Sequence, residues 1–202
     1  MSDSQRAAPA VFHETQELYR CGIHALNNVL QARVFEKSTL DDACLRLAAL
    51  AAEPSGSGGG GSSLWSRVWN PHRSPLGLGN YDVNALMLVL EEKGYAMQWV
   101  DKRRAMNSEL LDCDAIEGVL CNVVTSNFLR SVWETRHWFA IKKIGGVYYN
   151  LDSKLAHPVA FASEDACFAF LQELVDTGEC ELFAIAKAVK PEEPTTTTPT
   201  TQ

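Results

Sequence analysis

The sequence lacks the features that several classes of protein require. It has no C-x-x-C pair and no H-x-x-E-H cluster, so no stretch shows the ligand spacing of a common zinc site. No apolar run approaches the roughly 18 residues that a helix needs to span a bilayer, and no signal-peptide pattern is present. We therefore expect a protein with no metal or other cofactor and no membrane span.

Basic residues are in the minority, with 18 Lys and Arg against 25 Asp and Glu, and the net charge is −7. This balance argues against a nucleic-acid-binding surface and suits a partner that carries a basic face. Six widely spaced cysteines favour reduced thiols, most of them buried, over a disulfide framework. We expect a soluble protein of the cytoplasm or the nucleus. The sequence gives no indication of its oligomeric state.

The chain has the length of one domain with tails, and its 46% hydrophobic content is enough for a sizeable core. Residues 1–10 and 189–202 have the composition of disordered tails, which leaves one domain at 11–188. Within that domain PSGSGGGGSS, residues 54–63, predicts a flexible loop. Trp65 and Trp69 follow it and either form a partner-binding edge or pack beneath the loop.

Periodicity and end signals predict helices in the first half of the chain and mainly strands in the second. Helices are expected to begin at Cys21, at Ser38 with a capping box through Asp41, after Asp82, at Ser108 and over 163–175. Strands are expected at 95–100, 119–125, 180–189 and in a hairpin within 136–152. This order indicates an α+β fold with a largely antiparallel sheet.

The stretch QELYRCGIHALNNVLQ, residues 16–31, contains a candidate nucleophile. Ile23, Leu26 and Leu30 have the spacing of one helical face, which places Cys21 at the amino end of the helix. Unpaired backbone N–H groups and the helix dipole favour the thiolate there, and Gln16 lies close enough in sequence to supply an oxyanion donor. A single cysteine on a helix is, however, more often a core residue.

The second informative stretch is RHWFAIKKIGGVYYNLD, residues 136–152, which has the pattern of a hairpin. If Gly145-Gly146 form the loop, Ile144 pairs with Val147, and the same register places His137 diagonal to Asp152 on one face. Diagonal neighbours lie roughly 7–8 Å apart at the backbone, so the carboxylate can orient the imidazole. A hydrogen-bonded core histidine is the alternative interpretation.

A cysteine followed far downstream by His137 and Asp152 matches the papain-like order, in which the histidine activates the thiol. His24 lies one helical turn after the cysteine and is expected to pack or to hydrogen-bond rather than act as the base. His13 is expected to cap the chain entry. His72 and His157 are assigned no role.

Long motifs extend this reading to a family. The residues HETQELYRCGIHALNNVLQ at 13–31, GNYDVNALM at 79–87 and RHWFAIKKIGGVYYNLDSKL at 136–155 closely resemble the Josephin family of deubiquitinating cysteine proteases. DKRR at 101–104 and CELF at 180–183 also fit. The resemblance covers about residues 11–188 and is closest to the short Josephins, which are little more than the catalytic domain.

The resemblance implies a papain-like α+β fold and ubiquitin conjugates as substrates. It implies that Cys21 is the nucleophile, His137 the general base, Asp152 the orienting residue and Gln16 the oxyanion-hole glutamine. Gly22 replaces the alanine usual after the nucleophile, which we expect to loosen the first helical turn by less than about 1 kcal/mol.

The Gly/Ser tract and its flanking tryptophans lie where the family has a variable helical arm beside the ubiquitin site. Trp65 and Trp69 are therefore candidate substrate contacts, and Trp138, in the hairpin, is a third.

Together these features predict a deubiquitinase that hydrolyses the peptide, isopeptide or ester bond after the C-terminal glycine of ubiquitin. Its partners would be ubiquitin and ubiquitinated proteins. Three alternatives stay open: a ubiquitin-binding pseudo-enzyme or adaptor, an acyltransferase that uses a thioester cofactor, and a structural domain with inert thiols.

Overall fold

The computed structural model describes residues 10–18, 20–52, 81–125 and 135–188. The predictions made for residues 1–9, for the 54–63 loop, for Trp65 and Trp69 and for the tail 189–202 lie outside these residues. The helices are α1 (Cys21–Leu30), α2 (Lys37–Ala52), α4 (Val83–Glu92) and α5 (Glu164–Asp176). The strands are β1 (Tyr95–Trp99), β2 (Gly118–Thr125), β3 (Thr135–Ile144), β4 (Val147–Asn150), β5 (Val159–Ala160) and β6 (Cys180–Lys187). No helix in the described part of the chain is long and apolar enough to cross a membrane.

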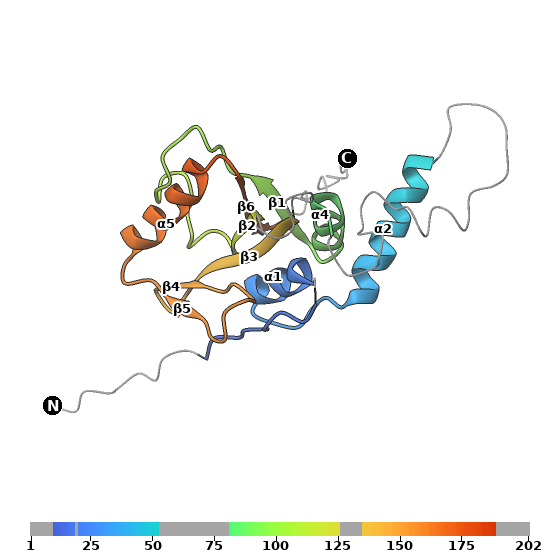
Figure 1. Ribbon diagram of the computed structural model, residues 1–202, viewed down its shortest axis with the longest axis horizontal. Helices are drawn as coiled ribbons and strands as arrows, with labels where there is room; N and C mark the ends of the chain where they lie inside the picture. The colour runs from blue at the N-terminus through green and yellow to red at the C-terminus, as the bar shows by residue number, and fades with distance from the viewer. Residues whose placement is uncertain (1–9, 19, 53–80, 126–134, 189–202) are drawn as a thin grey trace, which may run out of the picture.

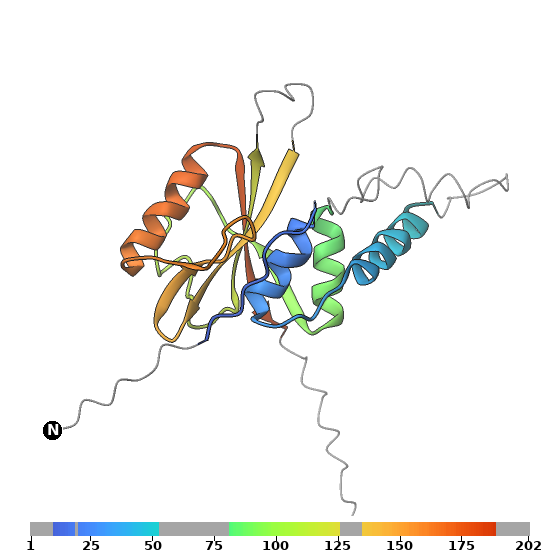
Figure 2. The same cartoon turned by 60° about the horizontal axis from the view of Figure 1, so that its bottom comes forward.

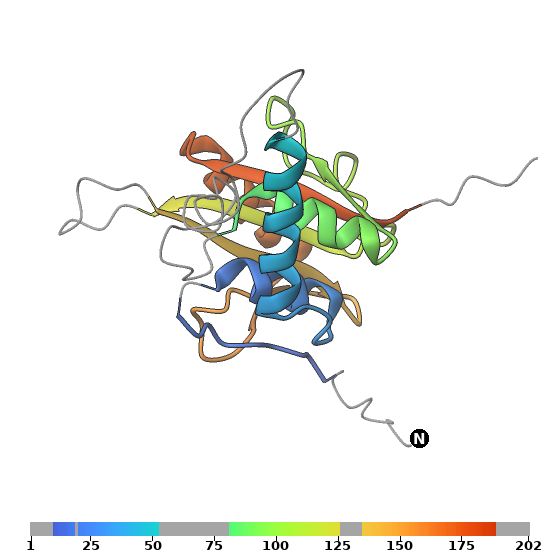
Figure 3. The same ribbon diagram turned by 90° about the vertical axis from the view of Figure 1, so that its right-hand side faces the viewer.

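One six-stranded sheet runs through the middle of the molecule in the order β1-β6-β2-β3-β4-β5, and each neighbouring pair is antiparallel. Helices α1 and α4 lie on one face of the sheet and α5 lies on the other (Figure 1, Figure 2). Helix α2 packs on α4 and is the outermost element on its side (Figure 3). The predicted α+β architecture with an antiparallel sheet is confirmed.

Side chains alternate along the strands and divide the core in two. On β3, Trp138 and Ala140 join the cluster under α1, α2 and α4, whereas Phe139 and Ile141 join the cluster under α5. This period of two is what a sheet covered on both faces requires. The sheet therefore fixes α1, through its packing on β3, at one defined place.

The predicted cap at Asp82 is present, and α5 has a cap of the same kind. Asp82 caps α4 by accepting a hydrogen bond from the backbone N–H of Ala85 at 3.0 Å. Beyond that helix Gly94 adopts φ 78°, a left-handed conformation that suits glycine and ends the helix. Ser163 caps α5 in the same way, through the N–H of Ala166 at 3.1 Å.

One predicted helix is absent, and another is present but begins one residue earlier than predicted. No helix follows Ser108, because side chains nearby bond the backbone in turns instead. Asn107 accepts from the N–H groups of Glu109 and Leu110, and Asp112 accepts from that of Asp114. Such local bonds compete with helix formation. Helix α2 also begins one residue earlier than predicted, at Lys37, so Ser38 lies inside the first turn rather than at the cap.

Gly22→Ala is expected to raise the free energy of unfolding by about 0.5–1 kcal/mol, because alanine is the better helix former. A methyl group at this position would lie 3.5 Å from Leu86 and 3.7 Å from Trp138, which is ordinary contact. Gly118→Ala is the matched control, since its methyl would lie 2.7 Å from the Ile141 carbonyl oxygen. Urea unfolding of both variants tests this. Destabilisation by Gly22→Ala would contradict it.

Candidate active site

The hairpin that carries the candidate base has the predicted register. Ile144 pairs with Val147, and the loop residues Gly145 and Gly146 adopt φ 59° and 86°. The strand pairing does not continue as far as predicted. It ends with Ile141 opposite Asn150, followed by one more hydrogen bond from Leu151 N–H to the Ala140 carbonyl at 2.8 Å. His137 and Asp152 therefore do not meet across a ladder.

A turn brings them together instead. Asp152 N–H donates to the Asn150 side-chain oxygen at 2.9 Å, and Asp152 Oδ1 accepts from Lys154 N–H at 2.9 Å. The same Oδ1 lies 2.7 Å from His137 Nε2. The contact between imidazole and carboxylate that the sequence predicted is present. Its geometry is set by the turn after β4, which holds the carboxylate before any substrate binds.

The two groups stabilise each other's charged forms. Burial lowers the pKa of His137, but hydrogen bonds to Asp152 and to the Cys21 side chain outweigh it and leave the pKa raised. Burial raises the pKa of Asp152, and the hydrogen bonds from His137 and from the Lys154 backbone outweigh that effect, so its pKa is lowered. With Nε2 facing Asp152, Nδ1 is the ring nitrogen left for the Cys21 sulfur. The arrangement suits an imidazolium between a carboxylate and a thiolate.

Cys21 is the first residue of α1 and is almost fully buried, with 4% of its surface exposed. The preceding residue, Arg20, forms no side-chain capping bond, so no capping side chain occupies the first backbone N–H groups of the helix. These N–H groups, and the positive end of the helix dipole, lie in the same first turn as Cys21. A developing oxyanion beside Cys21 would find donors there.

Four other thiols are unsuited to nucleophilic chemistry near neutral pH. Burial raises the pKa of Cys113 and Cys180 to about 11 and that of Cys167 to about 12. Cys121 is fully enclosed, and burial raises its pKa well above the ordinary value. Because the thiolate is the reactive form, these cysteines are poor nucleophiles near neutral pH.

Gln16, the predicted oxyanion donor, is hydrogen-bonded to neighbouring backbone. Its side-chain Nε2 donates to the Leu18 carbonyl at 2.6 Å, and its backbone N–H donates to the Ser153 carbonyl at 2.6 Å. Gln16 Oε1 and Ser153 Oγ are buried and have no hydrogen-bond partner within the described residues. Leu18 adopts φ 57°, which is uncommon for leucine. A cavity of about 420 Å³ lies beside these residues and Lys154.

The other predicted positions have mixed outcomes. Trp138 is 3% exposed, and its indole N–H donates to the Tyr81 carbonyl at 3.2 Å, so the ring packs in the core beneath the site. Trp138 could contact a substrate directly only if the residues that cover its ring moved away. His13 Nε2 lies 3.0 Å from the Leu155 carbonyl, which ties the lead-in to the turn after β4. His24 is a hydrogen-bonding residue, as predicted, with Nδ1 2.7 Å from Glu14 Oε2.

Sequence reasoning missed the buried polar side of α1. Asn28 is fully buried, and its side-chain nitrogen donates to the carbonyls of Glu14 and Leu151. It thereby links the nucleophile helix both to the lead-in and to the residue before Asp152. Two adjacent asparagines inside a predicted helix, where this residue is a weak helix former, were the available signal. Within the described residues, no group of three or more His, Cys, Asp or Glu side chains could hold a metal ion.

Comparison with known proteins adds a family match. The sequence model of the Josephin family matches residues 16–186, a range that contains Gln16, Cys21, His137 and Asp152. Josephin-2 from Homo sapiens is 41% identical over 191 residues, which cover 93% of this chain and 92% of that protein. A Josephin-like protein from Drosophila melanogaster is 36% identical, with 80% of this chain and 67% of that protein covered. One from Arabidopsis thaliana is 35% identical, with 86% and 46% covered.

Asp152→Asn is expected to lower the pKa of His137, because it removes the carboxylate that raises it. The stability that His137 contributes is present below its unfolded pKa near 6.5 and is lost as the pH rises through the folded value. The contribution of Asp152 is present above its unfolded pKa near 3.8 and is lost as the pH falls through the folded value. NMR titration of the histidine rings measures the shift, and an unchanged His137 pKa would contradict it.

Proposed function

The chain belongs to the Josephin family, whose members are associated with cysteine-type deubiquitination, and from this membership we propose that it is a thiol-dependent deubiquitinase. The proposed reaction is hydrolysis of the bond after the C-terminal glycine of ubiquitin, in peptide, isopeptide or ester conjugates. One observation supports it above the others. His137 Nε2 lies 2.7 Å from Asp152 Oδ1, and, against the effect of burial, Asp152 together with Cys21, the first residue of α1, raises the pKa of His137.

In the first half of the proposed reaction, the Cys21 thiolate attacks the carbonyl carbon of the glycine. The carbonyl π electrons move to oxygen, and the backbone N–H groups at the start of α1 stabilise the resulting oxyanion. As the tetrahedral intermediate collapses, the bond to the leaving nitrogen or oxygen breaks and His137 supplies its proton. Ubiquitin is then held as a thioester on Cys21.

In the second half, neutral His137 takes a proton from water, and the hydroxide formed in the transition state attacks the thioester carbonyl. Collapse of this second intermediate expels the Cys21 thiolate, which pairs again with the imidazolium, and releases the ubiquitin carboxylic acid, which loses its proton to solvent. Asp152 keeps the ring in place and stabilises its charged form in both halves. No step needs a metal or a redox partner.

The orientation of Gln16 favours one alternative. Its Nε2 donates to the Leu18 carbonyl, which leaves one of its two amide hydrogens for an oxyanion at Cys21. A chain in which this contact keeps the amide from the oxyanion would bind ubiquitin with little turnover, as a pseudo-enzyme or adaptor. In the enzyme that we propose, the bound ubiquitin tail displaces the Leu18 contact and Gln16 joins the oxyanion hole.

The proposed partners are ubiquitin and ubiquitinated proteins. An acidic chain with 25 Asp and Glu against 18 Lys and Arg suits a partner with a basic face. Reduced thiols are needed for the chemistry, so we place the activity in the cytoplasm or the nucleus.

Turnover of ubiquitin that carries a fluorogenic C-terminal amide tests this function. We expect hydrolysis by the reduced chain that is insensitive to EDTA, absent from Cys21→Ala, and reduced by about 10²–10⁴-fold in His137→Gln. Cys113→Ala is the matched control, because that thiol is half-buried, has a pKa raised to about 11 and takes no part in the site. Measurable ubiquitin binding without turnover would favour the pseudo-enzyme, and neither binding nor turnover would contradict both.

A further inference from the structure

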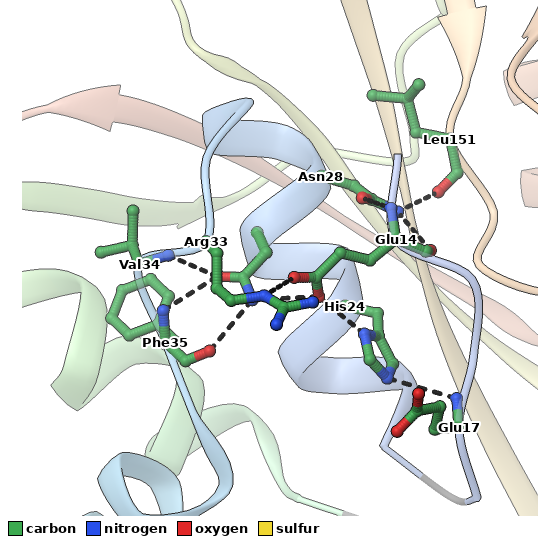
Figure 4. Close-up of polar contacts among 9 residues, drawn as sticks. Glu14, Glu17, His24, Asn28, Arg33, Val34, Phe35 and Leu151 are labelled. Carbon is green, nitrogen blue, oxygen red and sulfur yellow. Dashed lines mark hydrogen bonds and ion pairs between the residues drawn. The ribbon is translucent and has the colours of Figure 1, made fainter. Parts of the chain in front are cut away.

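Both ring nitrogens of His24 are hydrogen-bonded to the segment that precedes the nucleophile. Nδ1 lies 2.7 Å from Glu14 Oε2, and Nε2 accepts from the backbone N–H of Glu17 at 3.4 Å (Figure 4). A nitrogen that faces an N–H group must be the unprotonated one, so the ring proton is on Nδ1 and is donated to Glu14. The ring is therefore hydrogen-bonded to both ends of the segment from Glu14 to Glu17.

The carboxylate that anchors this ring is itself fixed. Glu14 is 7% exposed, and Oε1 accepts from Arg33 Nε at 2.8 Å while Oε2 also accepts from Asn27 Nδ2 at 3.1 Å. Burial raises the pKa of Glu14, but the hydrogen bonds from His24, Asn27 and Arg33 outweigh it and leave the pKa lowered. Asn28 holds the backbone of Glu14 through both its N–H and its carbonyl. Glu14 is a charged, immobile anchor.

The anchored segment contains Gln16, and the ring that spans it lies one helical turn after Cys21. We infer that His24 is a positioning residue, which holds the backbone of residues 14–17 against α1. In that position the Gln16 amide can reach the oxyanion formed at Cys21. This inference rests on the proposed function. The His24 ring is hydrogen-bonded to Glu14 and Glu17 rather than to Cys21 or His137, so it acts through Gln16.

The two bonds of the ring have separable consequences. The bond to Glu14 lies inside a buried network and contributes to folding. The bond to Glu17 holds the backbone of an exposed segment, which leads into Leu18 with its φ of 57° and its 63% exposure. Loss of the second bond would leave the backbone at Gln16 held by the Ser153 carbonyl alone, release Glu17 and keep the core network in place.

Two substitutions separate these roles by the shape of the side chain. Asn places its amide nitrogen near the position of Nδ1, so His24→Asn keeps a donor for Glu14 and has no atom at the position of Nε2. Gln places its amide near the position of Nε2, so His24→Gln keeps an acceptor for Glu17 and loses the donor for Glu14. Far-UV circular dichroism and urea unfolding establish that each variant is folded and give its stability.

We expect His24→Asn to be the more stable variant and the slower enzyme, with kcat for ubiquitin amide hydrolysis reduced about tenfold and KM nearly unchanged, a fraction of the effect of losing an oxyanion donor. We expect His24→Gln to recover most of that loss despite its lower stability. A purely structural role predicts the reverse order, with activity following stability, and that result would overturn the inference.

A double-mutant cycle tests whether His24 acts through Gln16. In a Gln16→Ala background, His24→Asn is expected to change kcat by less than about twofold, because the donor it positions is already gone. A persistent tenfold effect in that background would overturn the inference. Alkylation of Cys21 by iodoacetamide, which forms no oxyanion, is expected to proceed at the wild-type rate in His24→Asn.

Hydrogen exchange tests the placement without any turnover. The amide of Glu17 is expected to exchange at least about tenfold faster in His24→Asn than in the wild-type chain, and to stay protected in His24→Gln. Unchanged exchange in His24→Asn would overturn the inference even if the chain is an active deubiquitinase. Absence of ubiquitin turnover by the wild-type chain would instead contradict the proposed function, with the exchange result still deciding where His24 holds the segment.

Discussion

The active-site geometry depends on the burial of α1 on nearly all its sides. Nine of its ten residues are buried, so its polar side chains must find partners inside the protein. Asn28 meets this need by bonding both Glu14 and Leu151, and the helix that begins with Cys21 is thereby fixed against two distant segments. Asp152 follows Leu151 directly. A buried amide left without these partners would cost about 1–3 kcal/mol for each unmade bond.

This constraint explains how a cysteine, a histidine and an aspartate from three elements meet with little freedom. The sheet places His137 on β3, against which α1 packs. In the turn after β4, the Lys154 N–H donates to the Asp152 carboxylate and the Asn150 side chain holds the Asp152 backbone. Burial alone would favour a neutral imidazole and a protonated carboxyl. Their 2.7 Å contact opposes both tendencies, so each partner favours the charged form of the other, and Cys21 also raises the pKa of His137.

The sequence predicts those parts of the structure that local chemistry controls. Two glycines fix the hairpin loop and therefore the register of β3 and β4, and Asp82 and Ser163 each cap a helix. It does not predict where the ladder ends, because the turn at Asp152 competes with further pairing. The turns at 107–117 arise because short polar side chains bond nearby backbone in place of a helix.

The buried polar face of α1 could not be predicted from periodicity, which describes only the apolar face. Asn28 is satisfied by Leu151, a residue far along the chain. The orientation of Gln16 toward Leu18 likewise depends on a tertiary context that spacing does not encode. The most direct test of the account is incubation of the reduced chain with ubiquitin bearing a C-terminal thiol-reactive electrophile. We expect a covalent adduct on Cys21 that is absent from Cys21→Ala. An adduct that persists in that variant, or none on the wild-type chain, would contradict the assignment of Cys21 as the nucleophile of a ubiquitin site.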